Sequence, residues 1–454
     1  MAPFRLDGDS DDSGEVPPGL GPLETLRVHY EFVRDPAAMF RRLIREHGPI
    51  CRMWLGPMEH VLVGEPEAIR EILVDKPMSF HKSELMQLSR RLVGRGLVLN
   101  EDDSWRRQRK KVAPNLQPRH IQQYGKVMVQ ETRRLLDGWQ TGGTREFHAA
   151  MSEITMRVVV RTLFDLDPET STDEVSRILE RAMSAFQQML HPVQLFIPDA
   201  IPTPANVEFD RAVEHLDRKV YDLIERCRAK EKRGDDLLSR LVEATDDEGD
   251  GMTDRQLRDE IVTMFVAGHE TTALSLTCAF YLIARHPDVQ QRIHREIDDH
   301  LGARPPDVSD VGDLPYLDAA IREAMRLHPP IWVLGRKATE AVEIGGYRAP
   351  PGTQFFLPQC ALHRDPRFYD DPDTFRPDRW LEDRGDVPEF AYFPFGDGPR
   401  VCIGNHFAEM ETILVAATLF QNWRVDNHTD PPLDFQHSMT KRPTHPIELE
   451  VSRR

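Results

Sequence analysis

Cysteine is scarce in this chain, and long apolar runs are missing. The 454 residues contain five cysteines, which are scattered along the sequence and form no Cys-x-x-Cys pair. This usage argues against a disulfide framework or an iron–sulfur cluster and suits a reducing compartment. No stretch reaches the roughly 18 consecutive apolar residues of a membrane-spanning helix. We therefore expect a cytoplasmic protein without a transmembrane segment.

Excess basic charge and nucleotide-binding glycines are also absent. The net charge is −17, from 58 basic and 75 acidic side chains, which argues against binding to nucleic acid. No Gly-x-Gly-x-x-Gly fingerprint of a nucleotide cofactor occurs. Residues 1–25 are polar, acidic and rich in proline and glycine, without the features of a signal peptide. We expect residues 1–25 to be a flexible segment and residues 26–454 to form a single domain.

The spacing of apolar residues predicts a mainly α fold with small β-sheets. Alternation over Cys51–Leu55 and His60–Val63 predicts a hairpin, and Pro66 opens a helix. Between residues 102 and 300 the pattern is mostly helical. Examples are the segments Ile121–Leu136, Met151–Phe164, Asp173–Leu190 and Val207–Lys230.

A long helix is predicted to begin near Thr253, a plausible N-cap, and to continue past Leu282. Its segment Ile261–Leu282 is largely apolar, which predicts burial nearly all round. Short strands and prolines dominate after residue 330. A further helix over residues 403–421 and a strand pair are expected at the C-terminus.

A glycine-rich loop that contains a cysteine is the most informative segment. It runs over residues 393–404 as FPFGDGPRVCIG. Gly396 and Gly398 permit a positive φ, so the backbone can turn tightly against a partner. Cys402 precedes an apolar helical run, whose free N–H groups and dipole favour a thiolate. Such a thiolate could ligate iron, with Arg400 meeting a porphyrin propionate. The alternative is a buried thiol in a glycine turn.

The pattern Phe395-Gly396-x-Gly398-x-Arg400-x-Cys402-x-Gly404 resembles the haem-binding loop of the cytochrome P450 family at every position. The resemblance implies a P450 fold, with haem b between the long central helix and the helix after the cysteine loop. It implies Cys402 as the metal ligand. The other residues of the pattern expected to contact the cofactor are Phe395, Gly396, Arg400 and Gly404.

An acid and a hydroxyl stand together in the apolar helix, in the segment AGHETT. Since a buried charge is costly without a partner, these residues alone indicate a helix kink with a satisfied polar pair, or a site. The segment resembles the oxygen-activating motif of the family. The resemblance implies that Glu270 and Thr271 are catalytic and deliver protons to dioxygen, and that Ala267 and Gly268 lie against haem. His269 occupies the variable position and receives no role.

Two groups of arginines fit further motifs of the family. Glu323 and Arg326 lie three apart on one helix face, which by itself indicates a surface ion pair. The resemblance implies instead a buried structural network with Arg379. Asp378 and Trp380 depart mildly from the glutamate and phenylalanine that relatives more often have.

Trp105 and Arg109 lie four apart and resemble the tryptophan–arginine pair that contacts haem propionates in the family. Arg336 is a third arginine expected at a propionate, with Arg109 and Arg400, because the guanidinium fork binds a carboxylate through two hydrogen bonds.

A basic run over Arg106, Arg107, Arg109, Lys110 and Lys111 stands out in this acidic chain. Such a run is usually a solvated helix face. If it flanks the haem, it could steer an acidic ferredoxin or flavodoxin. Because the chain has no nucleotide or iron–sulfur motif, electrons from NAD(P)H must arrive through such a protein and its reductase.

The resemblance also implies a distal pocket for a small lipophilic substrate, such as a terpenoid, carotenoid, steroid or fatty acyl chain. The apolar, proline-broken segment 189–201 could border this pocket or touch a membrane surface. Core packing is the alternative for each single residue. The residues expected in the pocket are Met86, Met189, Phe196, Ala267, Val333, Leu334 and Met439.

The resemblance implies an enzyme, a monomeric cytochrome P450 monooxygenase that inserts one oxygen atom of O2 into its substrate. A peroxide-driven peroxygenase or an isomerase is a second possibility, but these usually lack the pair Glu270 and Thr271. A non-catalytic haem sensor is a third, for which an accessory domain would be expected and none is visible.

Overall fold

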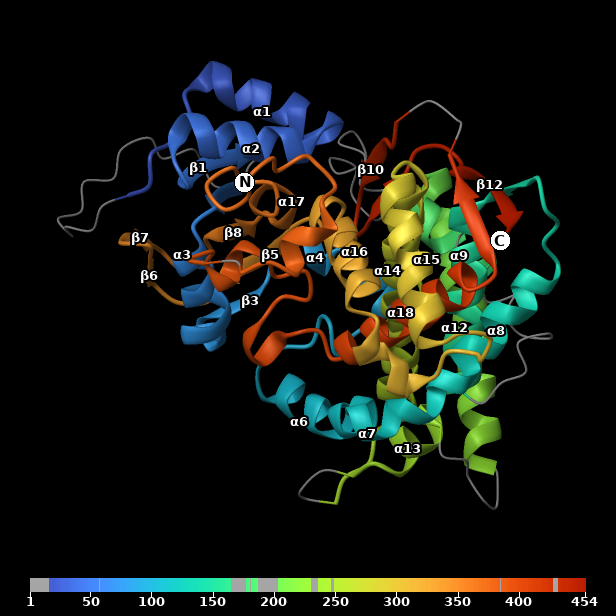
Figure 1. Cartoon of the computed structure of the whole chain (residues 1–454). Coiled ribbons are helices and arrows are strands. Elements are labelled where there is room, and N and C mark those ends of the chain that lie inside the picture. Colours follow the sequence, from blue (N-terminus) through green and yellow to red (C-terminus); the bar gives the residue numbers. More distant parts are fainter. Residues whose placement is uncertain are drawn as a thin grey trace.

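The computed structural model describes residues 16–56, 58–164, 177–179, 181–186, 203–229, 236–245, 249–383, 385–427 and 432–454. The predicted fold class is confirmed, because helices dominate and the sheets are small. Figure 1 shows a β-rich region with the first two helices on one side of the molecule, and the long helices on the other.

The β-rich region is built on a five-stranded sheet with the order β1-β2-β8-β5-β3. Ile50 pairs with Val63 and Leu55 with Met58, so the predicted hairpin is confirmed. β2 and β8 run parallel, and the other pairs are antiparallel. The strands of this sheet are β1 (Ile50–Leu55), β2 (Met58–Val63), β3 (Phe80–Lys82), β5 (Leu334–Ala338) and β8 (Gln354–Leu357).

Two helices, α1 (Pro22–Arg34) and α2 (Pro36–His47), pack beside this sheet (Figure 1). Glu24 of α1 accepts hydrogen bonds from Arg42 at 3.1 Å and His47 at 2.7 Å. The structure therefore places residues 22–25 in a helix, inside the segment for which flexibility is the expectation. α3 (Pro66–Arg70) begins at the proline that the sequence indicates, and a π-helical turn continues it to Asp75.

The helical region surrounds α14 (Asp254–Ala284), which begins after Thr253 as predicted. The Thr253 side chain accepts from the Gln256 amide while the Gln256 side chain accepts from the Thr253 amide, which forms a capping box. The other long helices are α6 (Asp102–Val112), α8 (Gly125–Asp137), α9 (Phe147–Leu163), α12 (Pro204–Ala229), α15 (Pro287–His300), α16 (Pro315–Leu327) and α18 (Asn405–Phe420).

Short elements connect these parts. The short helices are α4 (Glu84–Gln87), α5 (Arg90–Val93), α7 (Pro118–Ile121), α13 (Leu237–Glu243) and α17 (Gln359–Leu362). The remaining strands are β4 (Gly143–Glu146), β6 (Val342–Ile344), β7 (Tyr347–Ala349), β9 (Trp423–Asp426), β10 (Phe435–His437), β11 (Lys441–Pro443) and β12 (Glu448–Arg453). The predicted helix over 121–136 is α8, preceded by a tight 3-10 turn. Of the predicted helix over 173–190, the described residues 177–179 and 181–186 are helical.

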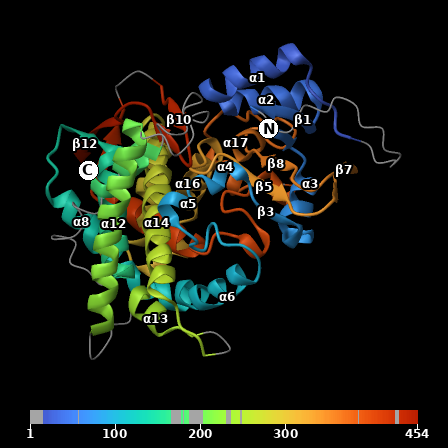
Figure 2. The same cartoon turned by 180° about the vertical axis from the view of Figure 1, so that it is seen from behind.

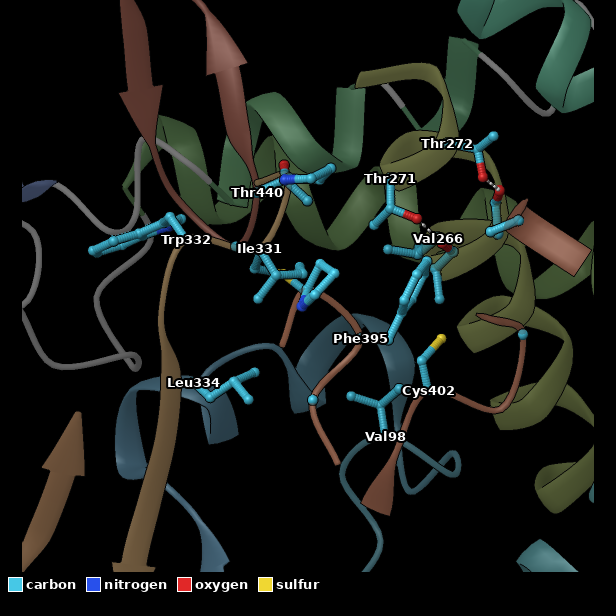
Figure 3. Close-up of a pocket in the computed structure, with 18 of the residues that line it drawn as sticks. Val98, Val266, Thr271, Thr272, Ile331, Trp332, Leu334, Phe395, Cys402 and Thr440 are labelled. Atoms are coloured by element: carbon cyan, nitrogen blue, oxygen red, sulfur yellow. Dashed lines mark hydrogen bonds between the residues drawn. The ribbon is translucent and has the colours of Figure 1, made fainter. Parts of the chain in front are cut away.

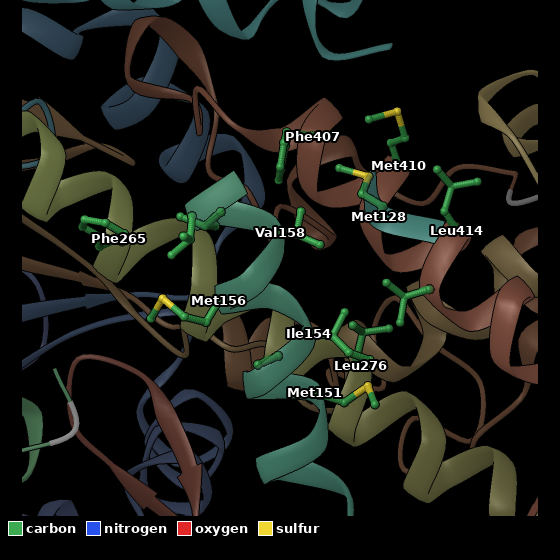
Figure 4. Packing of buried hydrophobic residues seen from close by; sticks show 14 of the residues in the cluster. Met128, Met151, Ile154, Met156, Val158, Phe265, Leu276, Phe407, Met410 and Leu414 are labelled. Carbon is green, nitrogen blue, oxygen red and sulfur yellow. The ribbon is translucent and has the colours of Figure 1, made fainter. Parts of the chain in front are cut away.

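α14 lies in the main hydrophobic core. Seen from behind, it runs beside α12 (Figure 2), and α9, α16 and α18 also pack against it. Figure 4 shows Phe265 and Leu276 of α14 among methionines and aliphatic side chains of α8, α9 and α18. Because α14 is surrounded on nearly all sides, its apolar composition is explained by burial in a protein core. In the described parts of the chain, no helix is long and apolar enough to cross a membrane.

Candidate active site

A cavity of about 970 Å³ lies between α14 and the cysteine loop. Its wall is largely apolar and includes Val98, Val266, Ile331 and Leu334, which Figure 3 shows around Cys402. Five of the residues that the sequence predicts for the pocket line it, namely Met86, Ala267, Val333, Leu334 and Met439. Two others, Met189 and Phe196, lie outside the described residues.

The cysteine loop is held in a tight turn beneath this cavity. Gly396 and Gly398 both have φ of +67°, and a Cβ on Gly398 would lie 2.0 Å from the carbonyl oxygen of Leu73. Only glycine therefore fits at position 398. The Cys402 amide donates to the Phe395 carbonyl at 2.9 Å, which closes the turn.

The Cys402 side chain is exposed to the cavity rather than to the outer surface, and its sulfur points into the space below α14 (Figure 3). Burial raises the pKa of the Cys402 thiol, although the Gly404 amide and Arg109 favour the thiolate. The helix N-terminus therefore does not suffice to ionise this sulfur at neutral pH. A bound metal ion would deprotonate it, because the cation compensates the charge that burial disfavours.

Cationic side chains collect at one end of the cavity. The Arg400 guanidinium lies 3.9 Å from the centre of the Trp105 ring, and it donates to the Asn100 carbonyl at 2.7 Å and to the carboxylate of Glu101. Arg109 donates to the Val401 carbonyl at 3.2 Å from both terminal nitrogens.

Arg336 lies in the same cluster, where burial and then the nearby Arg400 lower its pKa to about 10. Burial also lowers the pKa of Lys82 well below its ordinary value, and Arg336 and Arg400 reinforce the effect. Of these cations, Lys82, Arg109 and Arg400 line the cavity. Glu101 interacts electrostatically with Lys82, Arg336 and Arg400. The cluster is therefore richer in cations than in nearby carboxylates, which suits an anionic ligand.

The segment of α14 above the cysteine loop places Thr271 at the cavity and Glu270 behind it. Ala267, Gly268 and Thr271 line the cavity, and the Thr271 hydroxyl donates to the Ala267 carbonyl at 2.7 Å. The Glu270 side chain is buried and accepts a hydrogen bond from Thr440 at 2.9 Å.

The structural network expected around Glu323 lies next to the cavity, on α16. Glu323 and Arg326 are fully buried, with Nη2 of Arg326 at 2.8 Å from Oε1 of Glu323. Nε of Arg379 donates to the same oxygen at 2.8 Å. The indole of Trp380 donates to Oε2 of Glu323 at 2.9 Å, so the departure from the family pattern adds a donor. Asp378 pairs with Arg292 at 2.6 Å instead.

Most of the chain also matches known proteins. The family model for cytochrome P450 matches residues 17–451. Cyclooctat-9-en-7-ol 5-monooxygenase of Streptomyces melanosporofaciens is 35% identical over 383 residues, which cover 84% of this chain and 83% of that protein. Pentalenene oxygenase of Streptomyces avermitilis is 31% identical and covers 93% of both chains.

The chain belongs to the cytochrome P450 family. The family and its monooxygenase-named relatives show that it is a P450 monooxygenase. A second protein of Streptomyces melanosporofaciens, cyclooctatin synthase, is 34% identical over 90% of this chain and 89% of its own.

The donor set of this P450 fits the haem that the family implies. Cys402 brings a sulfur to the cavity wall, and Lys82, Arg109, Arg336 and Arg400 are cations that could neutralise two propionates. The hydroxyl of Ser83, at the cavity wall beside Lys82, is buried without a hydrogen-bond partner in the described structure. A buried unsatisfied hydroxyl next to a cation cluster indicates a missing polar ligand.

Sequence reasoning missed several of these side chains. Lys82 and Ser83 belong to no motif, and only the pairing of Lys82 with Arg336 across β3 and β5 brings them to the site. Glu411 was visible in principle, because it is an acid inside the apolar run of α18, just as Glu270 is in α14. Burial raises the pKa of Glu411 well above its ordinary value, although Thr272 beside it favours the carboxylate. Burial therefore favours the protonated form of Glu411.

Proposed function

We propose that this P450 hydroxylates a lipophilic substrate of the terpenoid class, with one atom of O2 entering the product. The observation that carries the proposal is the apolar cavity that Cys402 and Thr271 share. Apolar walls recognise a substrate by burial rather than by charge. Relatives named for pentalenene and for cyclooctat-9-en-7-ol support a terpene skeleton over a steroid, carotenoid or fatty acyl chain.

Residues in and beside the cavity would hold haem b, and others would transfer protons. Cys402 would ligate the iron, while Arg109, Arg336, Arg400 and Lys82 would neutralise the propionates. Trp105 packs against Arg400 and keeps that guanidinium in place. When bound, the thiolate-ligated haem supplies the activation of dioxygen.

Thr271 is one of the hydroxyl residues of α14 that line the cavity. We propose that it holds a water molecule and passes protons to dioxygen, with Glu270 as the acid behind it. The absent side chain of Gly268 leaves room beside α14, because Val159 is the one side chain of the described residues within 4 Å of a Cβ built there. Ala267, likewise small, keeps the wall close to the haem position open.

Electrons would come from NAD(P)H through a separate ferredoxin or flavodoxin and its reductase. The outer side of α6 carries Arg106, Arg107 and Lys110, all exposed, and we call these three residues the basic patch. Arg109 ties α6 to the cysteine loop at Val401, so the basic patch belongs to a helix that contacts this loop. The five cysteines are all free, which supports a reducing compartment such as the cytoplasm.

The test of haem-thiolate ligation is the carbon monoxide difference spectrum of the reduced protein. We expect a Soret band shifted far to the red in the wild type and a band at the position of histidine-ligated haem in Cys402→His. A wild-type band at the histidine position, in freshly purified folded protein, would refute the thiolate and with it the proposed chemistry. Pentalenene should displace water from the cavity and perturb the ferric spectrum, whereas an equally concentrated polar sugar should not.

A further inference from the structure

The catalytic acid proposed above does not face the cavity. Glu270 is 4% exposed and lies outside the cavity wall, whereas its neighbour Thr271 lines it. Both carboxylate oxygens are occupied, because Nε of Arg442 donates to Oε1 and Nη2 of Arg442 donates to Oε2. Thr440 donates to Oε1 as well, at 2.9 Å. The acid is therefore held by residues about 170 positions further along the chain.

These two partners belong to one small element, which we call the C-terminal hairpin, residues 435–443. β10 and β11 pair with Phe435 opposite Pro443, and residues 438–440 form the turn. The Ser438 amide donates to the Thr440 carbonyl at 3.0 Å and closes this turn.

The same hairpin is a wall of the cavity. Residues 436–440 line it, so Thr440 contributes both to the wall and to the hydrogen bond with Glu270. The hairpin is tied to the neighbouring wall, because the Trp332 indole donates to the Ser438 carbonyl at 2.9 Å and the Lys441 amide donates to the Pro330 carbonyl at 2.9 Å. A substrate that presses on this wall acts on an element that holds the acid.

The charges around Glu270 favour its ionised form. Burial alone would raise the pKa of Glu270, but Arg442, His269 and Thr440 outweigh it and keep that pKa below its ordinary value. The other titratable group that faces it is His148 of α9, whose pKa burial lowers. Burial also lowers the pKa of His269, to about 4. Burial therefore favours the uncharged form of both imidazoles, and Arg442 is the cation that fixes the carboxylate.

We propose that Arg442 is a positioning residue that, with Thr440, holds Glu270 away from the oxygen site until a substrate displaces the C-terminal hairpin. The proposal rests on the proposed function, since it needs Glu270 to be the proton source. In the substrate-free protein the acid is bound to the hairpin and protons do not reach the cavity through it. Substrate binding and proton delivery then share one element, which protects against oxygen reduction without a product.

Without the contact between Arg442 and Glu270, NAD(P)H should be oxidised even when no substrate is present. We call this substrate-free NAD(P)H oxidation the leak. In Arg442→Gln, Glu270 is released and protons reach the oxygen site, so NAD(P)H, H⁺ and O2 give NAD(P)⁺ and hydrogen peroxide. We expect substrate-free NAD(P)H oxidation with a plant-type ferredoxin and its reductase to rise roughly tenfold or more. Because the carboxyl stays buried without its cation, the acidic limb of the pH profile should move up by about one unit or more. Glu270→Gln should abolish both effects in the Arg442→Gln background.

Conservative variants separate positioning from folding. Arg442→Lys keeps the positive charge but loses the guanidinium that donates two hydrogen bonds. Its substrate-free NAD(P)H oxidation should be slower than that of Arg442→Gln. Thr440→Val removes only the hydroxyl donor and should raise the leak to an intermediate level. Arg424→Gln is the control, because it removes an exposed arginine–carboxylate pair, with Asp426 at 3.1 Å, from β9. It should leave the leak unchanged.

Thermal unfolding of the same proteins supplies a readout independent of turnover. The Tm loss of the double variant Arg442→Gln, Glu270→Gln should be smaller than the sum of the single losses, because the two side chains bind each other. Additive losses with an unchanged leak and pH profile would overturn the proposal, as would a Thr440→Val protein that leaks no more than the wild type. If the wild type lacks the red-shifted carbon monoxide band, the proposed function fails, and the thermal cycle still decides whether Arg442 holds Glu270.

Discussion

At the scale of single residues, Glu260 is a carboxyl group buried in α14, and no cation of the described residues is among the groups that shift its pKa. It is 0% exposed, and the Leu97 amide donates to it at 3.2 Å. Burial raises the pKa of Glu260 to about 8, so it is protonated at neutral pH. The loop that covers it packs tightly, since a Cβ on Gly96 would lie 2.0 Å from the Thr263 hydroxyl.

Glu260→Gln should therefore stabilise the protein in a pH-dependent way. The native pKa lies above the ordinary value of 4.5, so the native state binds more protons than the unfolded state between pH 4.5 and about 8. In this window the unfolding free energy of the wild type falls as the pH rises. The glutamine does not titrate, so the advantage of the variant should grow to roughly 4 kcal/mol at pH 8 and above.

Urea unfolding at pH 5 and pH 8 measures this difference. Glu225→Gln, at an exposed position of α12, is the matched control and should show no pH-dependent gain. An equal effect of Glu260→Gln at both pH values would mean that Glu260 is ionised throughout.

At the scale of elements, the network around Glu323 joins α16 to the segment before the cysteine loop. Trp380→Phe removes one donor and installs the residue that relatives more often carry. Because Glu323 is charged and buried, the lost hydrogen bond should cost about 1.5–3 kcal/mol of unfolding free energy.

Urea unfolding, with haem absorbance as a second probe, measures this loss. Trp54→Phe, at a tryptophan of β1 that is 40% exposed, should cost far less. If Trp380→Phe loses no more unfolding free energy than Trp54→Phe, the arginines satisfy the hydrogen bonding of Glu323 without the indole.

The sequence predicts best those elements that are stabilised by residues close together in the chain. The start of α14 follows from the Thr253 and Gln256 side chains, which lie three residues apart and cap the same turn. The hairpin of β1 and β2 follows from alternation on either side of a turn. The C-terminal hairpin was expected only as a strand pair, because nothing within residues 435–443 reveals that Arg442 reaches α14.

At the scale of the whole molecule, the site is a set of contacts between distant segments. Cys402, Glu270 and Thr271 could be named from motifs, since each motif is contiguous. The side chains that surround them could not be named in this way. Arg442 is 172 positions from Glu270, and Lys82 lies beside Arg336 because β3 pairs with β5. Family resemblance led to Arg109, Arg336, Arg379 and Arg400 but not to Arg442.

The molecule as a whole is acidic, with a net charge of −17, whereas the basic patch is locally positive. Arg109 is turned inward to the Val401 carbonyl, and Lys111 donates to the Asp250 carbonyl at 2.7 Å. The basic patch therefore forms the outer side of α6. An acidic electron donor would be attracted to it against the repulsion of the remaining surface.

Arg106→Glu combined with Lys110→Glu should slow reduction by an acidic ferredoxin roughly tenfold at low ionic strength, because two attractive charges become repulsive. Stopped-flow measurement across a salt series checks this, and the difference from wild type should shrink at about 1 M salt, where the screening length is ~3 Å. Arg211→Glu with Arg218→Glu, two exposed positions of α12, changes the net charge equally and should slow reduction much less. Reduction by dithionite should be unaffected in both. Equal slowing by the two double variants would mean that net charge alone, and not the basic patch, attracts the donor.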